Sequence, residues 1–281
     1  MFNQNIKAPV NIPVSKIHPF EGNPYKVLDN DEMNILIGSI QEQGILTPII
    51  IRPIENTDEY EVISGHRRLH ATVKAVMKEV PAFIYAVTRD EAAIMLVDSN
   101  LHREHILPSE KAFAYKLKLE AMKHQGITCG QVGHKSRDEI SDTDSGRQIQ
   151  RYIRLTYLIP ELLDLVDEEK IALTPAVELS YLTDEEQYAL LGSIEVEDRT
   201  PSLSQAVRFK KLSQTGNLSD DDIETIMQED KANQKPMFKV SMEKLQEIAP
   251  RVKDKDFEDF VLKACEHYYR YLLRQRDRDS R

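Results

Sequence analysis

Two periodicities of apolar residues alternate along the N-terminal part of the chain. Short apolar runs bounded by turn residues predict strands, at residues 10–17, 47–54, 60–64 and 80–87. Apolar residues three and four apart follow Asp29 and recur after Leu69, which predicts two helices, and Gly44 stands where the first should end. Residues 88–91 have capping-box spacing and predict a third helix that reaches Leu101.

From Pro108 onward the pattern is helical throughout. Helix-start residues followed by apolar positions at helical spacing predict helices that begin near residues 108, 145, 160, 175, 183, 202 and 220. The last predicted helix is amphipathic and runs roughly from Asp254 to Arg274, in a short unit with little else to cover its apolar stripe. That stripe favours self-association.

The fold class that follows is α+β. We expect a small mixed α/β domain at residues 1–104 and an all-α domain at residues 105–228. Residues 229–237 are polar and include a proline, as is typical of a linker, and residues 238–281 form a helical C-terminal association unit.

Composition narrows the class of protein. A chain of 281 residues with 41% hydrophobic residues can bury the cores of two or three domains. No apolar run approaches the roughly 18 residues that a membrane helix requires, and the first residues lack a signal pattern, so we expect a cytoplasmic protein with no membrane partner. Cys129 and Cys265 lie far apart, which argues against disulfides and cysteine-rich zinc sites.

Charge is distributed unevenly. The net charge of −10 argues against a chain that coats nucleic acid without specificity. Residues 156–200 alone contain twelve acids and two bases, whereas residues 145–155 contain three arginines and no acid. Because attraction to phosphate is short-ranged in salt, a basic helix beside an acidic body can still bind DNA.

The stretch VISGHRRLHA carries the first candidate chemistry. Val62 and Ile63 read as the end of a strand, and Ser64-Gly65 opens into His66, Arg67 and Arg68 at the start of a helix. Exposed backbone N–H groups, the helix dipole and three potential cations make such a turn receptive to phosphate. The same residues also fit a helix start whose arginines only face solvent.

Three short stretches together resemble one family. GILTPIIIR, VISGHRRLHA and DSNLHRE are similar, in order and spacing, to three boxes of the ParB-type partition proteins, which include the Noc proteins. The resemblance covers roughly residues 10–215 and implies a pocket for cytidine triphosphate with Mg²⁺, whose occupancy closes a dimeric DNA clamp. The residues it places in the nucleotide pocket are Gly44, Thr47, Pro48, Arg52, Ser64, Gly65, His66, Arg67, Arg68, Asn100 and Arg103.

The chain departs from the family pattern at three positions. His66 and Ser99 stand where the family has glutamates, and His102 replaces a glutamine. The resemblance assigns Asn100 to Mg²⁺. Ser99, beside it, replaces a glutamate, and a carboxylate is a stronger ligand for Mg²⁺ than a serine hydroxyl. Two alternatives therefore stay open: a weak CTPase switch, and a protein that keeps the fold without nucleotide turnover. Sulfiredoxins share the fold and act through a cysteine at this turn, which the chain lacks, so thiol chemistry is excluded here. The chain also has no P-loop sequence, which excludes an ATPase of the P-loop type.

The second candidate region is a helix-turn-helix. Residues 127–132 supply a short first helix, and the second runs from Ser145, its N-cap, to roughly Leu158. Ile149, Ile153 and Leu155 can face the core. The residues expected to read base edges or contact the DNA backbone are Arg147, Gln148, Arg151 and Arg154 on the helix, with Ser145, Lys135, Ser136 and Arg137 before them. An ordinary helical bundle with solvated arginines is the alternative.

The expected function is that of a site-specific DNA-binding protein of the ParB type. By resemblance, it is a homodimer that binds a palindromic double-stranded site, uses CTP and Mg²⁺, and works in chromosome, plasmid or mobile-element segregation with a partner ParA-type ATPase. It would then be associated with the nucleoid. The alternative is a transcriptional or nucleoid-associated regulator that does not bind nucleotide.

Overall fold

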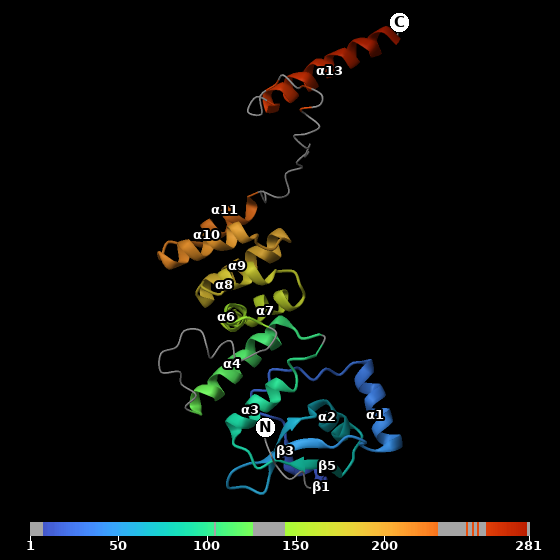
Figure 1. The fold of residues 1–281 in the computed structure, drawn as a ribbon. Helices are drawn as coiled ribbons and strands as arrows, with labels where there is room; N and C mark the ends of the chain where they lie inside the picture. The colour runs from blue at the N-terminus through green and yellow to red at the C-terminus, as the bar shows by residue number, and fades with distance from the viewer. Residues whose placement is uncertain are drawn as a thin grey trace. The chain divides into compact units, whose positions relative to one another are not determined.

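The computed structural model describes residues 8–103, 105–125, 144–229 and 257–279, together with residues 246, 249 and 252 (Figure 1). The chain divides into two units, Met1–Glu229 and Asp230–Arg281. The predicted first helix of the helix-turn-helix, the loop after it and most of the predicted linker lie outside the described residues.

A five-stranded mixed sheet forms the centre of the N-terminal part, in the order β1-β5-β3-β4-β2. Its strands are β1 (Val10–Pro13), β2 (Ile17–His18), β3 (Ile49–Pro53), β4 (Tyr60–Ser64) and β5 (Glu79–Ile84). The prediction of one strand over residues 10–17 is wrong, because the 3-10 turn η1 (Val14–Lys16) separates β1 from β2. Val14 still donates its N–H to the carbonyl of Lys78, in the register of the β1–β5 ladder, and the turn then leads the chain to β2.

Helices α2 (His66–Lys74) and α3 (Arg89–Asp98) pack on this sheet, and α1 (Asp31–Gln43) packs against α2. The predicted stop of α1 at Gly44 is confirmed, with φ at +72°, and so is the capping box of Thr88 and Glu91 at the start of α3. Successive side chains of β3 point to opposite faces of the sheet and pack into two different cores. Ile49 and Ile51 pack with Val62 and Leu69, whereas Ile50 packs on the other side with residues of α3.

The rest of the first unit is helical, which confirms the expected fold class. Its described helices are α4 (Pro108–His124), α6 (Gly146–Leu155), α7 (Pro160–Asp167), α8 (Leu173–Leu179), α9 (Asp184–Glu197), α10 (Leu203–Gln214) and α11 (Asp220–Gln228). Leu155, Leu162, Leu190 and Phe209 belong to one buried core that these helices share. The helix expected to begin at Pro175 begins two residues earlier, because proline is tolerated within the first helical turn.

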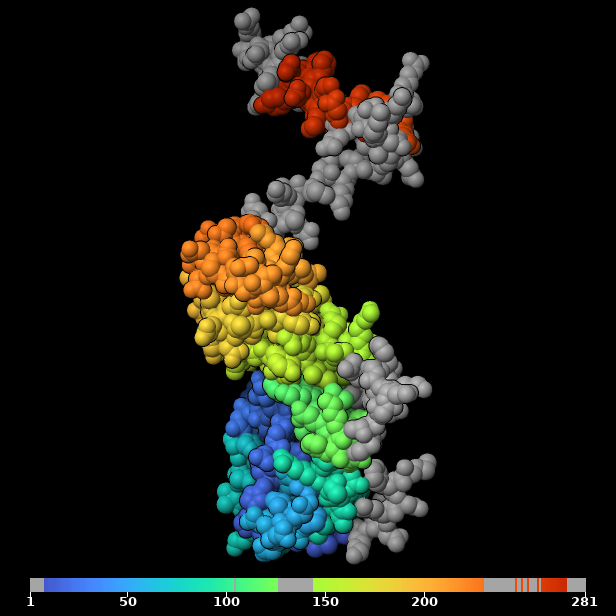
Figure 2. All heavy atoms as spheres, turned by 90° about the vertical axis from the view of Figure 1, so that its left-hand side faces the viewer, coloured from blue at the N-terminus to red at the C-terminus, as the bar shows by residue number. Residues whose placement is uncertain are grey.

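Polar contacts join α4 both to the elements before it and to α7 after it. The Lys118 ammonium lies 2.5 Å from the Asp98 carboxylate, and Glu110 accepts the backbone N–H of Lys26 at 2.9 Å. Asp167 of α7 accepts the backbone N–H of Ser109. Figure 2 shows the blue atoms of the N-terminal segment against the green atoms of α4. The sheet and the following helices therefore pack as one unit.

The described part of the second unit is the helix α13 (Phe257–Asp279). It was expected over residues 254–274, and it continues further because no glycine or proline stops it. The rings of Tyr268 and Tyr271 stack on its surface, with centroids 6.2 Å apart. None of the helices among the described residues is long and apolar enough to span a membrane.

Candidate functional site

The turn between β4 and α2 requires a glycine. The strand ends at Ser64, the helix begins at His66, and Gly65 between them has φ at +104°. A Cβ at this position would lie 2.7 Å from Cγ2 of Ile49, closer than such atoms approach in proteins. Both the backbone angle and the close approach therefore exclude a side chain, and the first turn of α2 stays open at its N-terminus.

Arg68 folds back from α2 onto the segment that precedes β3. Its Nη1 donates to the carbonyl oxygens of Thr47, at 2.5 Å, and Pro48, at 2.8 Å. Burial lowers the pKa of this guanidinium from its usual value. Two of the three sequence stretches that suggested a nucleotide pocket are therefore held together by one arginine.

His66 and Arg67 differ in the charge they bring to this turn. Arg67 is exposed and pairs with Glu32, with 3.1 Å between Nη2 and Oε2. Burial, and then the charge of Arg103, lower the pKa of His66 to about 4. Its Nε2 accepts the backbone N–H of Phe20 at 3.4 Å. Of the three potential cations at this turn, the two arginines remain, because a histidine with this pKa is neutral at pH 7.

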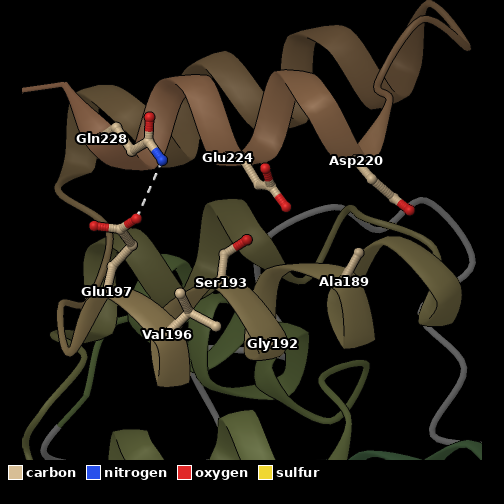
Figure 3. A pocket seen from close by; sticks show the side chains of 8 residues that line it. All are labelled: Ala189, Gly192, Ser193, Val196, Glu197, Asp220, Glu224 and Gln228. Carbon is tan, nitrogen blue, oxygen red and sulfur yellow. Dashed lines mark hydrogen bonds between the residues drawn. The ribbon is translucent and has the colours of Figure 1, made fainter.

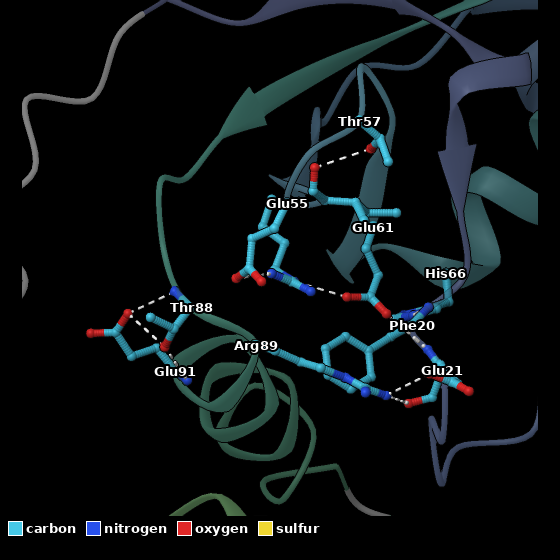
Figure 4. Close-up of polar contacts among 11 residues, drawn as sticks. Phe20, Glu21, Glu55, Thr57, Glu61, His66, Thr88, Arg89 and Glu91 are labelled. Atoms are coloured by element: carbon cyan, nitrogen blue, oxygen red, sulfur yellow. Dashed lines mark hydrogen bonds and ion pairs between the residues drawn. The ribbon is translucent and has the colours of Figure 1, made fainter. Parts of the chain in front are cut away.

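Arg52 and Glu61 form a second polar cluster on the neighbouring strands. The two side chains are buried, and Nε of Arg52 donates to Oε2 of Glu61 at 2.8 Å. The other oxygen of Glu61 accepts the backbone N–H of Glu21, whose carboxylate pairs with Arg89 (Figure 4). Nη1 of Arg52 is buried and has no hydrogen-bond partner within the described part of the chain. Sequence reasoning missed Glu61, although its place opposite Arg52 in a hairpin could have indicated it.

The third stretch lies at the end of α3. Asn100 is buried, and its amide nitrogen donates to the carbonyl of Leu96 at 2.7 Å and to Oγ of Ser99 at 3.2 Å. The guanidinium of Arg103 lies over the ring of Tyr25, 5.4 Å from its centroid. Because the charge of Arg103 also acts on His66, this stretch and the glycine turn are brought together.

The basic helix is α6, and Ser145 is its N-cap as expected, with its hydroxyl accepting the backbone N–H of Gln148. Ile149 and Leu155 are fully buried as predicted, whereas Ile153 is only partly buried. Arg147 is exposed at the start of the helix.

The other two arginines of α6 contact α8 and the residues after it. Arg151 donates to Oγ1 of Thr174 at 2.6 Å. Arg154 donates from Nε to Oγ of Ser180, at 3.0 Å, and from Nη2 to the carbonyl of the same residue, at 2.7 Å. The predicted backbone contacts Lys135, Ser136 and Arg137 lie outside the described residues.

Residues 3–101 match the family model of the ParB N-terminal domain. This part of the chain belongs to the ParB N-terminal domain family. Its boundaries include the glycine turn, the Arg52–Glu61 pair and Asn100, so the three stretches all lie within or directly beside one ParB N-terminal domain.

Relatives of known name match a longer part of the chain than the family model does. The chain is 32% identical over 162 residues to the chromosome-partitioning protein Spo0J of Thermus thermophilus, covering 58% of this chain and 56% of the relative. It is 31% identical over 139 residues to a nucleoid occlusion protein of Listeria monocytogenes, covering 50% and 48%. The matched region therefore spans about half the length of these relatives.

Among solved structures, the C-terminally truncated chromosome-partitioning protein ParB from Caulobacter crescentus complexed to the centromeric parS site aligns with a TM-score of 0.41. The identity is 18%, and the alignment covers 78% of this chain and 98% of that one. Sulfiredoxin from Arabidopsis thaliana aligns with a TM-score of 0.27 and 23% identity, over 32% of this chain and 98% of that one.

The ParB resemblance implies Mg²⁺, and the described residues do not fit a dedicated magnesium site. Asn100 is buried with its amide nitrogen turned to the backbone, and the nearby Asp98 is paired with Lys118. Within the described ranges, no three histidine, cysteine, aspartate or glutamate side chains form a metal-binding group. Mg²⁺ takes its protein ligands mainly from carboxylates, so the metal assignment of Asn100 gains no support from its surroundings.

A cavity of about 310 Å³ lies away from the ParB N-terminal domain, between α9 and α11 (Figure 3). Its wall includes the carboxylates of Glu197, Asp220 and Glu224, and a hydrogen bond of 3.2 Å joins Gln228 to Glu197 at one end. An anionic ligand such as a nucleotide would be repelled here, so the glycine turn is the better phosphate site.

Proposed function

We propose that this protein is a site-specific DNA-binding protein of the ParB type, in which a nucleotide at the glycine turn switches a DNA-bound dimer into a clamp. The observation that carries it is the open N-terminus of α2 with two arginines at its first turn. The names of the relatives, a chromosome-partitioning protein and nucleoid occlusion proteins, support a role in the segregation of a chromosome, plasmid or mobile element.

The phosphate groups of CTP are proposed to bind at the backbone N–H groups that follow Gly65. Arg68 is already fixed beside this turn by Thr47 and Pro48. Arg67 can move to the phosphate because its exposed pair with Glu32 is worth at most about 1 kcal/mol. Arg103 adds a third cation from the end of α3. The remaining pocket residues proposed by resemblance are Gly44, Arg52, Ser64, His66 and Asn100.

In this proposal the arginines neutralise the charge of the triphosphate, which Mg²⁺ does in the family pattern. His66 and Ser99 stand where the family pattern has glutamates, and Asp98 is paired with Lys118, so the carboxylate surroundings that a magnesium ion favours are reduced. We therefore propose nucleotide binding, rather than hydrolysis, as the event that drives the switch.

DNA is proposed to bind along α6. Arg147 and Gln148 lie in the first turn of this helix, where a recognition helix contacts base edges, and Arg151 follows one turn later. Lys135, Ser136 and Arg137 are proposed to contact the DNA backbone. Self-association through the apolar stripe of α13 would give a homodimer that reads a palindromic site in the nucleoid, with a ParA-type ATPase as its partner.

Calorimetric titration of the purified protein with CTP, ATP and GTP tests the nucleotide site. We expect selective binding of CTP that is lost in Arg67→Ala. Arg89→Ala is the matched control, because this arginine also forms an exposed pair with a glutamate, at 2.8 Å, but at the start of α3. Equal loss in both variants, or no binding of any nucleotide with or without DNA, contradicts the proposal.

The alternative function is that of a nucleotide-independent regulator on the same fold. The observation in its favour is the neutral His66, which stands where the family pattern has a glutamate. Both functions require DNA binding by α6, so only nucleotide dependence separates them. A protein that binds DNA equally with and without CTP is the regulator.

A further inference from the structure

A surface of cations and tyrosines begins where α6 ends. It consists of Arg154, Tyr157, Tyr181 and Lys210, and we call it the cation–tyrosine patch. The guanidinium of Arg154 lies 4.5 Å from the ring centroid of Tyr157 and 3.9 Å from that of Tyr181. The ammonium of Lys210, on α10, lies 3.8 Å from the centroid of Tyr181. Both tyrosines are exposed, at 56% and 39%.

The patch continues the arginine stripe of α6. Arg147, Arg151 and Arg154 are separated by four and three residues, so they share one face of the helix. Seven residues of α-helix rise about 10 Å, which equals roughly three base-pair steps of about 3.4 Å. Tyr181 follows α8 and Lys210 lies on α10, so the patch extends this stripe beyond the end of α6.

The charge of the patch contrasts with its surroundings. Residues 156–200 contain twelve acids and two bases, and most of the surface they provide repels DNA. Glu178 is an acid beside the patch, and its carboxylate pairs with Lys210 at 2.8 Å. No carboxylate accepts from Arg154 in these contacts, because its partners at Ser180 are a hydroxyl and a carbonyl. A net positive charge therefore remains at the C-terminal end of the proposed recognition helix.

The side chains of the patch are held in position before any partner binds. Two hydrogen bonds to Ser180 and two aromatic rings fix Arg154, and the ring of Tyr181 and the carboxylate of Glu178 fix Lys210. Long cationic side chains lose rotamer entropy when they bind, so cations that are already ordered bind phosphate at lower cost.

We propose that the cation–tyrosine patch binds the phosphate backbone of duplex DNA on the flank of the bases that α6 reads. Lys210 and the hydroxyl of Tyr181 contact phosphate, and Arg154 positions the ring of Tyr181. This surface rests on the proposed DNA-binding function of α6, and it lengthens the footprint of each protomer beyond the recognition helix. The contact is independent of sequence, because phosphate and sugar are the same at every step.

The test measures the affinity of the full chain for a random-sequence duplex over a range of salt concentrations. Lys210→Gln is expected to weaken binding several-fold and to reduce the salt slope by about 0.9, the value for one lost phosphate contact. Lys211→Gln is the matched control, since it removes the same charge from the next, exposed position of α10. Equal effects of the two variants overturn the inference.

A second test uses a variant that should bind DNA more tightly, because a misfolded variant would bind more weakly. Glu178→Gln removes the carboxylate that pairs with Lys210, so binding should become several-fold tighter. Glu195→Gln, on the exposed surface of α9, should leave affinity unchanged at physiological salt, where the Debye length is about 8 Å. No tightening in Glu178→Gln overturns the inference. If the wild type itself binds no duplex, the proposed function of α6 fails instead.

Discussion

Arg52 on β3 and Glu61 on β4 form an ion pair across the two strands, with both side chains buried. The register of the antiparallel pair sets these residues opposite each other. Glu61 also accepts the backbone N–H of Glu21, so the pair fixes the loop that carries Phe20 over His66. The ion pair thus supports the same region of the ParB N-terminal domain in which the nucleotide is proposed to bind.

Loss of this pair should be costly to stability. Glu61→Gln leaves the charge of Arg52 buried with only the exposed carboxylate of Glu55 near it, 3.9 Å from Nη1, and breaking a buried pair costs roughly 3–5 kcal/mol. Glu59→Gln is the control on the same hairpin, because Glu59 pairs with His18 at an exposed position, where a loss below about 1 kcal/mol is expected. Urea unfolding followed by circular dichroism measures both. Similar losses would mean that the buried pair has no special role.

Gly65→Ala should destabilise the glycine turn by about 1–3 kcal/mol, because the new Cβ meets Ile49 and the positive φ strains any side chain. Gly22→Ala has a similar φ of +80° but open space around it, so its loss should be smaller. Ile49→Ala deletes the Cγ2 atom that the new Cβ meets, so comparing the double variant Gly65→Ala with Ile49→Ala against Ile49→Ala alone measures how much of the cost is steric. If Gly22→Ala is as damaging as Gly65→Ala, the close approach to Ile49 is not the cause.

His66 should make stability depend on pH in a defined window. Its pKa falls from 6.5 in the unfolded chain to about 4 in the folded one. Between these values the unfolded state binds a proton that the folded state does not, so stability is complete above pH 6.5 and falls as the pH drops towards 4. The expected loss is about 3 kcal/mol, from about 1.4 kcal/mol for each unit of pKa.

Unfolding free energies at several pH values measure this loss. His66→Gln should flatten the dependence, because glutamine does not titrate and its oxygen can still accept the N–H of Phe20. His102→Gln, at an exposed position, should keep the full dependence. A variant His66→Gln with an unchanged pH profile would show that another group is responsible.

Features that depend on neighbours in the sequence were predictable. The capping box of Thr88 and Glu91 and the stop of α1 at Gly44 follow from local chemistry, and the structure confirms both. The resemblance also named Arg52, Arg68 and Asn100 as one site, although it did not show which backbone groups they contact.

Features that depend on distant packing were not predictable. His66 was counted as a potential cation, but it is partly buried and accepts the N–H of Phe20, which lies 46 positions earlier in the chain. Glu61 gained its role only from the strand register that sets it against Arg52. Arg154 looked like a base-reading residue, yet the arrangement of α6 against the end of α8 turns it towards Ser180. No periodicity in the sequence reports such tertiary contacts.

Arg67 and Arg68 should be separable by experiment. Arg67→Ala is expected to lose CTP affinity with a stability loss below about 1 kcal/mol, because only an exposed ion pair is removed. Arg68→Ala should lose affinity and also about 1.5–3 kcal/mol of stability, the value of hydrogen bonds from a charged group. Calorimetry and urea unfolding on the same samples make the comparison. A fully stable Arg68→Ala would mean that Thr47 and Pro48 do not need this arginine.

Arg147 and Arg154 should differ in the same way on α6. Arg147→Ala removes an exposed side chain at the start of the helix, so DNA affinity should fall while the unfolding free energy changes by no more than about 0.5 kcal/mol. Arg154→Ala removes two hydrogen bonds to Ser180 and the cation between Tyr157 and Tyr181, so stability should fall by about 1–3 kcal/mol.

Fluorescence anisotropy with labelled duplex DNA, alongside urea unfolding, measures both quantities for these variants. Arg154→Lys distinguishes the two roles of Arg154, because lysine keeps the charge but cannot make both hydrogen bonds to Ser180. We expect it to recover part of the DNA affinity and little of the stability. If Arg147→Ala binds DNA as well as the wild type, the first turn of α6 does not contact bases, and the recognition surface must lie elsewhere in the chain.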